Sequence, residues 1–249
     1  MALETLERDG QFQGLRLPKA AVEEIRKFTN RSMCYGNADP ALACEPGQVE
    51  NAVDDRGQPI VIADYLESIK DCGAIRRLWE DRQLLEIAGG YLRTEPRLVR
   101  SRLWWSLPLR PAARKECNGG GTAAAVNPAI FGQNRYHFDL HDWRTLKFFF
   151  YLTDVHEGCG PHVFIRGSHR HHKLVDQFSL KRGFNASPLL DRYGAENVVK
   201  VTGDAGFGFV EDPFGFHTGL PVTKSPRLIL EVTFGVSRHS PAGTHNAAI

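Results

Sequence analysis

The sequence predicts a mainly β fold in which helices pack around a jelly-roll-like core. Short β-prone runs alternate with turn residues in the second half of the chain, and helical patterns are confined to the first hundred residues. Several short strands separated by turn signals are typical of an all-β sandwich or barrel. The runs are LVRSRLWWSLPL, TLKFFFYLT, HVFIRG, NVVKVT, AGFGFV and RLILEVTFGV.

Two segments near the N-terminus predict helices. Residues 17–30 have apolar side chains near helical spacing and Pro18 close to the start. Residues 74–92 repeat that pattern, and we expect this helix to stop at Gly89 and Gly90. Residues 35–57, rich in Gly, Pro, Asn and Asp, predict a loop. We expect one domain over residues 1–249, with a helical part at about 1–95 and the β core at about 97–238.

The composition is that of an ordinary soluble globular protein, with 42% hydrophobic and 24% charged residues. A net charge of +2 gives no reason to expect nucleic acid or a membrane surface as partner. The five cysteines include no CxxC pair, which argues against a disulfide framework or a zinc finger and favours a reducing, cytoplasmic setting. The N-terminus is too polar for a signal peptide, and the apolar run at 148–152 is too short to span a bilayer.

The segment YHFDLHDWR, residues 136–144, carries two histidines and two carboxylates. If it is a strand, His137, Asp139 and His141 share one face and Asp142 points away. Neighbours on that face are about 6.6 Å apart, so His137 and Asp139 can converge on one ion. The two histidines would be about 13 Å apart, too far for bonds of about 2 Å to one metal. The segment therefore supplies two ligands, and a third must come from elsewhere.

The best candidate for the third ligand is His217, in a turn-rich connection before a strand that carries Arg227. Two imidazoles and one carboxylate form the facial triad of non-heme Fe(II) oxygenases, which leaves coordination positions open. The arginine ten positions later (227 − 217 = 10) can hold a distal carboxylate of a chelating co-substrate in two parallel hydrogen bonds. An isolated HxD is common by chance, and the combination is what indicates a metal site.

Four motifs lie in the part of the chain from His137 to Arg227 and just around it: YHFD, FYLTDVHEGCGPHVFIRGSHR, GFHTG and SPRLILEV. With these motifs the chain resembles the phytanoyl-CoA dioxygenase family of iron(II)- and 2-oxoglutarate-dependent oxygenases. Two positions depart from the family's commonest pattern: Tyr136 stands where many members have Trp, and Arg166 where many have Pro.

The resemblance implies a double-stranded β-helix core in which His137, Asp139 and His217 bind Fe(II). It implies that Arg227 binds the far carboxylate of 2-oxoglutarate and adds Lys147, in the following strand, as a second contact to it. With O2 as the other co-substrate, the implied reaction hydroxylates an unactivated C–H bond and releases succinate and CO2. Halogenating relatives have a small residue at the carboxylate position, so Asp139 favours hydroxylation or a related oxidation.

Other residues receive different interpretations. His141 is expected to have no role in metal binding, with pocket lining or support of a ligand as the alternative. His169 is expected to be structural, and the three glycines at 119–121 are expected to belong to a lid. Trp104 and Trp105 must face opposite ways on a strand, one into the core.

Two alternatives stay open, a non-catalytic jelly-roll binding protein and a cupin-like metalloenzyme that does not use 2-oxoglutarate. The presence of His137, Asp139, His217 and Arg227 together argues against the first, and Arg227 argues against the second. The sequence shows no cluster that would bind the phosphates of coenzyme A, so we expect a small polar metabolite as substrate. Its pocket walls are expected from the N-terminal helices and from residues 117–133 and 176–196. The sequence predicts no oligomeric state.

Overall fold

The computed structural model describes residues 1–37, 39–45, 47–53, 60–108, 135–140, 142–172 and 183–237. His141, the glycines at 119–121 and the expected pocket wall at 117–133 lie outside these residues.

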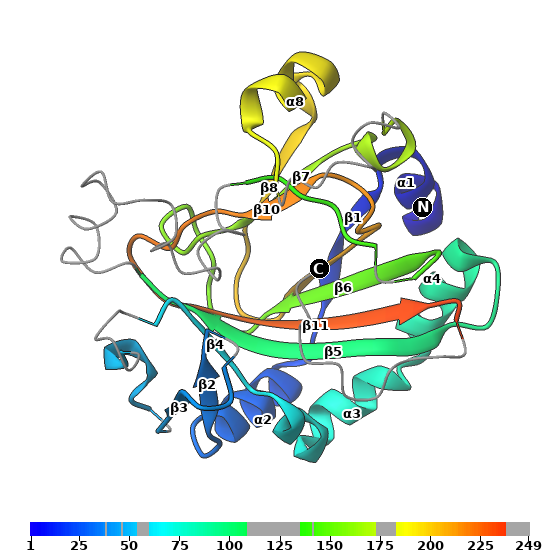
Figure 1. The fold of residues 1–249 in the computed structure, drawn as a ribbon. Coiled ribbons are helices and arrows are strands. Elements are labelled where there is room, and N and C mark those ends of the chain that lie inside the picture. Colours follow the sequence, from blue (N-terminus) through cyan, green and yellow to red (C-terminus); the bar gives the residue numbers. More distant parts are fainter. Residues whose placement is uncertain are drawn as a thin grey trace.

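Two antiparallel sheets face each other (Figure 1). The larger has eight strands in the order β1-β9-β6-β11-β5-β4-β2-β3, and the smaller has three in the order β10-β7-β8. An isolated bridge between His137 and His217 adds a further chain segment beside β10. This is the predicted jelly roll. The strands are β1 (Gln11–Arg16), β2 (Cys34–Gly36), β3 (Ala43–Cys44), β4 (Ile62–Asp64), β5 (Arg97–Ser106), β6 (Thr145–Tyr151), β7 (His162–Ile165), β8 (Val198–Val201), β9 (Phe207–Glu211), β10 (His217–Gly219) and β11 (Arg227–Gly235).

The central strands β6 and β11 are buried on both faces, which explains their nearly continuous apolar sequences. Side chains alternate along each strand, so Phe148 and Leu230 pack outward under the helices, whereas Phe149 and Ile229 pack between the two sheets. The inward face also receives the polar residues of β11, which are Arg227, Glu231 and Thr233.

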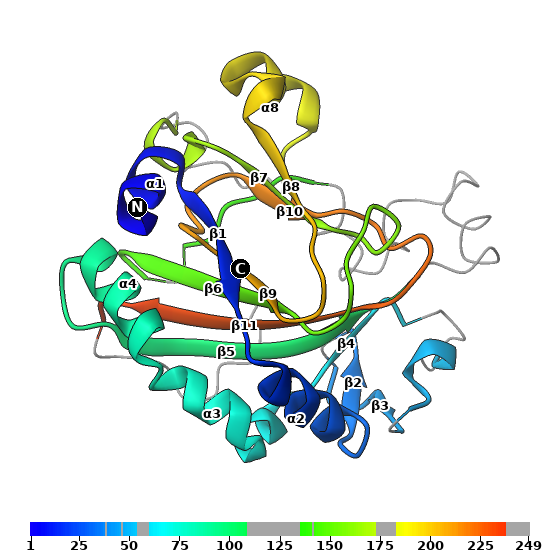
Figure 2. The same ribbon diagram turned by 180° about the vertical axis from the view of Figure 1, so that it is seen from behind.

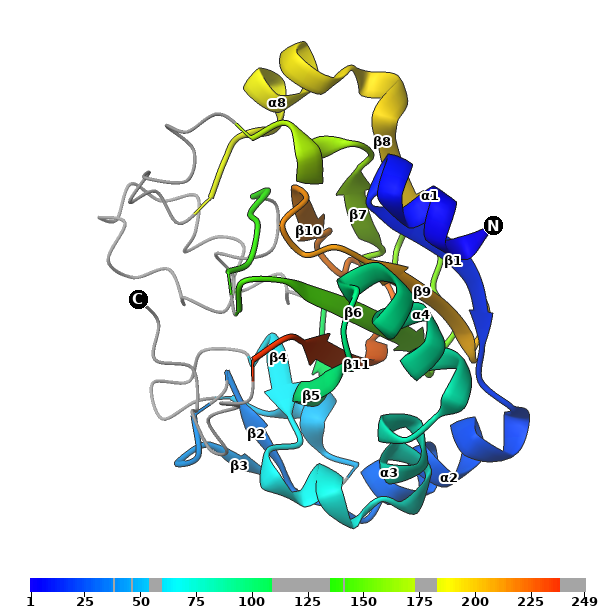
Figure 3. The ribbon, with the colours of Figure 1, turned by 90° about the vertical axis from the view of Figure 1, so that its right-hand side faces the viewer.

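Helices cover the outer face of the larger sheet, below β5 and β11 in Figure 1 and on the right in Figure 3. They contribute Ile25, Phe28, Ile75 and Leu84 to the outer core. One helix, α8 (Ala186–Tyr193), lies instead beyond the smaller sheet (Figure 1). Among the described residues no helix is long and apolar enough to cross a membrane. The other α-helices are α1 (Ala2–Asp9), α2 (Lys19–Thr29), α3 (Gly73–Trp79) and α4 (Arg82–Leu92).

The helix predicted over residues 74–92 was wrong in two respects. The segment forms two helices instead of one. The first helix ends at Trp79, and Asp81 caps the N-terminus of α4 by accepting a hydrogen bond from the amide of Leu84. The predicted stop at Gly89 and Gly90 does not occur, since α4 continues to Leu92. A Cβ on Gly90 would lie 2.7 Å from Leu3, so this glycine permits the close approach of α1.

The N-terminal part also contains strands that the sequence did not predict. The most important is β1, which pairs with β9 at the edge of the larger sheet (Figure 2). Its alternation is broken by an irregularity between Gln13 and Leu15, where Gly14 has a φ of 112°. The predicted loop at residues 35–57 overlaps β2 and contains β3. Of the described residues between 136 and 142, where a strand was considered, only Tyr136 and His137 form β-bridges.

Phe148→Ala is expected to lower the free energy of unfolding by about 3–5 kcal/mol, because the ring is fully buried between the larger sheet and the helices. Urea unfolding monitored by circular dichroism measures this. Trp143→Ala is the matched control, since that side chain is 93% exposed and its removal should change stability little. Equal stabilities of the two variants would contradict the assigned packing of β6.

Candidate metal centre

Three side chains from two distant segments meet at one end of the barrel interior. His137, Asp139 and His217 each offer a ligand atom, and these atoms all lie within 4.8 Å of one another. The backbones of His137 and His217 exchange two hydrogen bonds of 2.9 Å. The amide of Asp139 donates to the carbonyl of Pro213 at 2.8 Å, which fixes the turn that carries its carboxylate inward. The three residues predicted as ligands are therefore brought together, although residues 138–140 are not in a strand.

Backbone carbonyls orient both imidazoles. His217 Nδ1 lies 2.9 Å from the Gly215 carbonyl oxygen, and His137 Nδ1 lies 3.3 Å from that of Arg135. A neutral imidazole that donates from Nδ1 presents the lone pair of Nε2 as a ligand. His217 Nε2 is 3.5 Å from Asp139 Oδ2, so this nitrogen faces the carboxylate. Burial, together with the charge of His217, lowers the pKa of His137 to about 4, which keeps that ring neutral near pH 7.

A buried lysine compensates the charge of Asp139. Lys147 Nζ lies 2.6 Å from Asp139 Oδ2 and 3.7 Å from Glu231 Oε2. Burial opposes ionisation of Asp139, but Lys147 and the two histidines hold its pKa well below the ordinary value. The structure thus pairs Lys147 with a metal-site carboxylate, and its predicted contact with a co-substrate stays a prediction.

Glu231 makes the stability of this charged interior depend on pH. Burial raises the pKa of Glu231, but Lys147, Arg100 and Arg102 outweigh it and lower the pKa to about 2 from the usual 4.5. Because the pKa of Glu231 is lower in the folded state than in the unfolded chain, its carboxylate stabilises the folded protein fully above pH 4.5. This contribution is lost as the pH falls toward 2.

We therefore expect the melting temperature to fall over this acidic range, and to fall less in Glu231→Gln, measured by differential scanning fluorimetry at successive pH values. Parallel falls in the two proteins would show that Glu231 is not a source of the acid sensitivity.

Arg227 is buried inside the barrel at the start of β11. Its Nη2 donates to Ser106 Oγ at 3.0 Å and its Nη1 donates to the Gly160 carbonyl. Its Nε is buried and has no hydrogen-bond partner among the described residues. Since Arg227 and Glu231 are four positions apart on one strand, both face the interior that holds Lys147 and Asp139. The guanidinium therefore presents an unsatisfied donor inside the same barrel as the triad.

A further buried pair, His162 and Glu211, has no role that was predicted from the sequence. His162 Nε2 lies 2.8 Å from Glu211 Oε2, and the carboxylate is fully buried. Burial raises the pKa of Glu211, but His162 and His217 more than compensate, so the pKa is lowered. The available signal was an acidic residue at the end of the apolar run FGFVE.

The remaining predicted residues have structural positions. His169 is buried in the turn after β7, where its Nε2 lies 3.3 Å from the Glu7 carbonyl oxygen. Trp104 faces the interior beneath the guanidinium of Arg102, at 4.4 Å from ring centroid to carbon. Trp105 points the other way and donates to Tyr65 Oη at 3.1 Å. The two tryptophans therefore lie on opposite faces of β5, as the alternation along a strand predicted.

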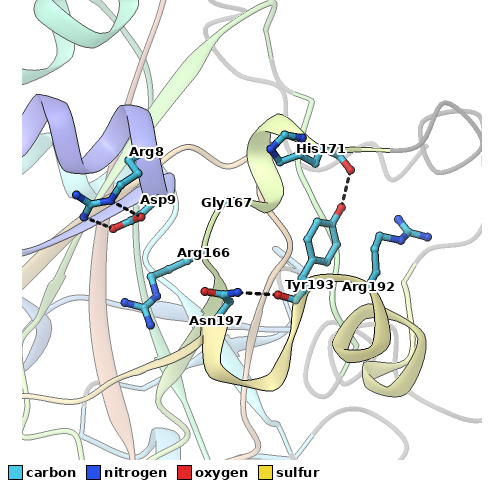
Figure 4. A pocket seen from close by; sticks show the side chains of 8 residues that line it. All are labelled: Arg8, Asp9, Arg166, Gly167, His171, Arg192, Tyr193 and Asn197. Atoms are coloured by element: carbon cyan, nitrogen blue, oxygen red, sulfur yellow. Dashed lines mark hydrogen bonds and ion pairs between the residues drawn. The ribbon is translucent and has the colours of Figure 1, made fainter.

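A surface hollow of about 410 Å³ lies elsewhere, between the end of α1, the turn after β7 and the end of α8 (Figure 4). None of the triad residues lines it. Arg8 folds back onto Asp9 with two hydrogen bonds, and the guanidinium groups of Arg166 and Arg192 point to different sides in Figure 4. These groups do not converge on one position, so the hollow lacks the geometry of an anion site.

No protein-family model matches the chain, and no curated protein matches it in sequence. The resemblance to the phytanoyl-CoA dioxygenase family is therefore not confirmed. Solved structures do match. A non-heme α-ketoglutarate-dependent epimerase, SnoN from nogalamycin biosynthesis, has a TM-score of 0.60 at 14% identity, over 94% of this chain and 79% of its own.

Two further structures give the same result. EctD from S. alaskensis with bound Fe has a TM-score of 0.60 at 20% identity, over 94% of this chain and 75% of its own. HygX from Streptomyces hygroscopicus, with nickel and 2-oxoglutarate bound, has a TM-score of 0.59 at 15% identity, over 95% of this chain and 87% of its own. The chain has the fold of 2-oxoglutarate-dependent non-heme iron enzymes. At these identities the likeness establishes the jelly-roll fold, and the chemistry must be argued from the side chains.

Proposed function

We propose that this protein is an Fe(II)- and 2-oxoglutarate-dependent dioxygenase that hydroxylates, or otherwise oxidises, an unactivated C–H bond of a small metabolite. One observation carries the proposal: His137, Asp139 and His217 converge inside a barrel that also holds Arg227, whose Nε has no partner in the described part of the chain. The structures of EctD with Fe and of HygX with nickel and 2-oxoglutarate support the choice of cofactor and co-substrate. Within this class, the sequence motifs favour the phytanoyl-CoA dioxygenase-like family.

The residues present fit the group that they would hold. Two imidazole nitrogens and one carboxylate oxygen are the donor set of non-heme Fe(II) sites, which keep open positions for a chelating ligand and dioxygen. Bound Fe(II) would supply oxygen activation coupled to the oxidative decarboxylation of 2-oxoglutarate to succinate and CO2. The unpartnered Arg227 Nε gives a distal carboxylate a charge-assisted hydrogen bond that the described residues leave unmade.

The chain itself supplies orientation and a dry environment. The carbonyls of Gly215 and Arg135 fix the imidazole tautomers, and Asp139 stays ionised at neutral pH. Phe149 and Phe209 stack at 5.0 Å between their ring centroids and pack in the interior core between the sheets. Their apolar surface excludes water, so the attraction between Arg227 and a bound carboxylate would be stronger than in water.

The substrate that we propose is a small polar metabolite. Lys147 lies between Asp139 and Glu231, and the charges of both carboxylates act on Arg102, whose Nη2 donates to Asp64 Oδ2 at 3.0 Å. An apolar chain placed against such groups would desolvate them without replacing their hydrogen bonds. EctD with 5-hydroxyectoine and HygX with hygromycin B also hold polar compounds. The proposal includes no nucleic acid and no membrane as partner. A cytoplasmic location is part of it, on the ground of the cysteine pattern, which lacks a CxxC pair.

Succinate formation tests the proposed function. Purified protein incubated in air with Fe(II), ascorbate and 2-oxoglutarate should form succinate above a metal-free control, since such enzymes turn over slowly without their main substrate. A panel of polar metabolites added singly should identify compounds that accelerate it. No succinate, together with no 2-oxoglutarate binding by calorimetry, would exclude the proposed reaction and leave a binding protein or a metalloenzyme of another kind.

A further inference from the structure

Glu211 is the last residue of β9, and its carboxylate side chain has no exposure to solvent. Strand register places it opposite Lys147 of β6 on one side and Gln11 of β1 on the other. Burying a carboxylate is unfavourable unless specific partners compensate for the lost hydration. The proposed function, which uses the triad and Arg227, does not account for this group.

The partners of Glu211 are two histidines. Its Oε2 lies 2.8 Å from His162 Nε2, while its Oε1 lies 3.9 Å from His217 Nδ1 and has no hydrogen-bond partner among the described residues. The His162 ring packs against Phe149 and Phe209, with centroids 5.3 and 5.1 Å away. His162 is therefore a rigid support that holds one carboxylate oxygen and leaves the other beside His217.

The side of His217 on which Glu211 lies decides what the carboxylate can do. The Nε2 atom of His217 faces Asp139, and its Nδ1 atom faces the Gly215 carbonyl and Glu211. An ion bound through Nε2 would lie beyond the far side of the ring from Glu211. Glu211 cannot share that ion, but it can attract the proton on Nδ1.

We propose that Glu211, oriented by His162, is a positioning residue that strengthens His217 as a metal ligand. The Gly215 carbonyl accepts the Nδ1 proton at 2.9 Å, and the negative charge of Glu211 at 3.9 Å from Nδ1 makes Nε2 a better electron-pair donor. A carboxylate partner of this kind typically raises metal affinity by about 10–100-fold. The inference rests on the proposed binding of metal by His217.

The decisive comparison is between wild-type protein and Glu211→Gln, which keeps the shape and removes the charge. Titration with Co(II) under calorimetry, without turnover, should show affinity lower by about 10-fold or more in the variant. The KM for 2-oxoglutarate at saturating metal should not change.

Asp212→Asn is the matched control, since it removes a carboxylate one position further along. Asp212 accepts hydrogen bonds from Tyr91 Oη at 2.6 Å and from the Phe214 amide at 2.9 Å. The control should retain the wild-type Co(II) affinity. If the substitutions act by a general disturbance of the segment before His217, the Co(II) affinity will fall equally in both variants. That result would overturn the role given to the charge of Glu211.

Two other results separate the inference from the proposed function. Equal Co(II) affinities of wild type and Glu211→Gln would overturn the positioning role and leave the proposed function intact. No Co(II) or Fe(II) binding by wild type would overturn the proposed metal site itself. If Glu211→Gln fails to fold, His162→Gln takes its place, because it removes the support of the carboxylate. A loss of Co(II) affinity in that variant supports the role, and an unchanged affinity contradicts it.

Discussion

Asp139→Ala is expected to lower Fe(II)-dependent succinate formation by at least about 100-fold, because losing an outer partner of a metal ligand already costs 10–100-fold. The substitution removes the only carboxylate among the three converging groups and leaves two imidazoles. Metal affinity and succinate formation should fall together, measured by Co(II) calorimetry and by the rate of succinate release. The fold should survive, since Lys147 retains Glu231 at 3.7 Å as a second anionic partner.

Asp142→Ala is the control for that variant. Its carboxylate lies three positions further along the same segment and accepts hydrogen bonds from the amides of Val236 and Ser237 at 2.9 and 2.8 Å. We expect lower thermal stability and unchanged metal affinity. Metal binding that survives Asp139→Ala, or that is lost equally in Asp142→Ala, would contradict the assignment of Asp139 as a ligand.

Arg227→Ala is expected to raise the KM for 2-oxoglutarate by roughly 30–5000-fold, because removing one partner of a buried charge pair costs about 2–5 kcal/mol. The metal affinity should stay at the wild-type value, since Arg227 contacts Ser106 and Gly160 and none of the three ligand residues. Steady-state kinetics with 2-oxoglutarate varied at saturating Fe(II) measures the first effect, and Co(II) calorimetry measures the second.

Arg227→Lys refines the test, because an ammonium keeps the charge and loses the planar pair of donors. Its KM should lie between those of wild type and Arg227→Ala. Arg144→Ala is the control, since Arg144 donates to the Tyr91 carbonyl at 3.0 Å and has no contact with the triad or with Arg227. A KM that changes equally in Arg144→Ala and Arg227→Ala would show that the effect is not specific to the proposed carboxylate site.

The strands of the β core were predictable because local sequence determines them. Runs such as TLKFFFYLT and RLILEVTFGV are largely apolar, and both are central strands buried on two sides. The irregular β1 was not predictable in this way, because Gly14 interrupts its pattern and its pairing with β9 is nearly two hundred positions away in sequence (207 − 16 = 191).

Only those site residues that belong to a recognisable sequence motif could be predicted. The spacing of His137, Asp139, His217 and Arg227 matched a known chemical requirement, and the structure places all four side chains in one barrel. The pair formed by His162 and Glu211 spans 49 positions and depends on how β7 lies across from β9, which no local pattern reveals. The salt bridge of Lys147 with Asp139 likewise follows from the barrel's closure and was not foreseen.

Binding of 2-oxoglutarate in the presence and absence of metal tests the central claim most directly. Calorimetric titration of wild-type protein under anaerobic conditions, first with Mn(II) or Fe(II) and then without metal, compares the two states. If His137, Asp139 and His217 hold an ion that the co-substrate chelates while Arg227 holds its far carboxylate, binding should be tight with metal and weak without it. Binding of equal strength in both states, or no binding in either, would contradict the claim.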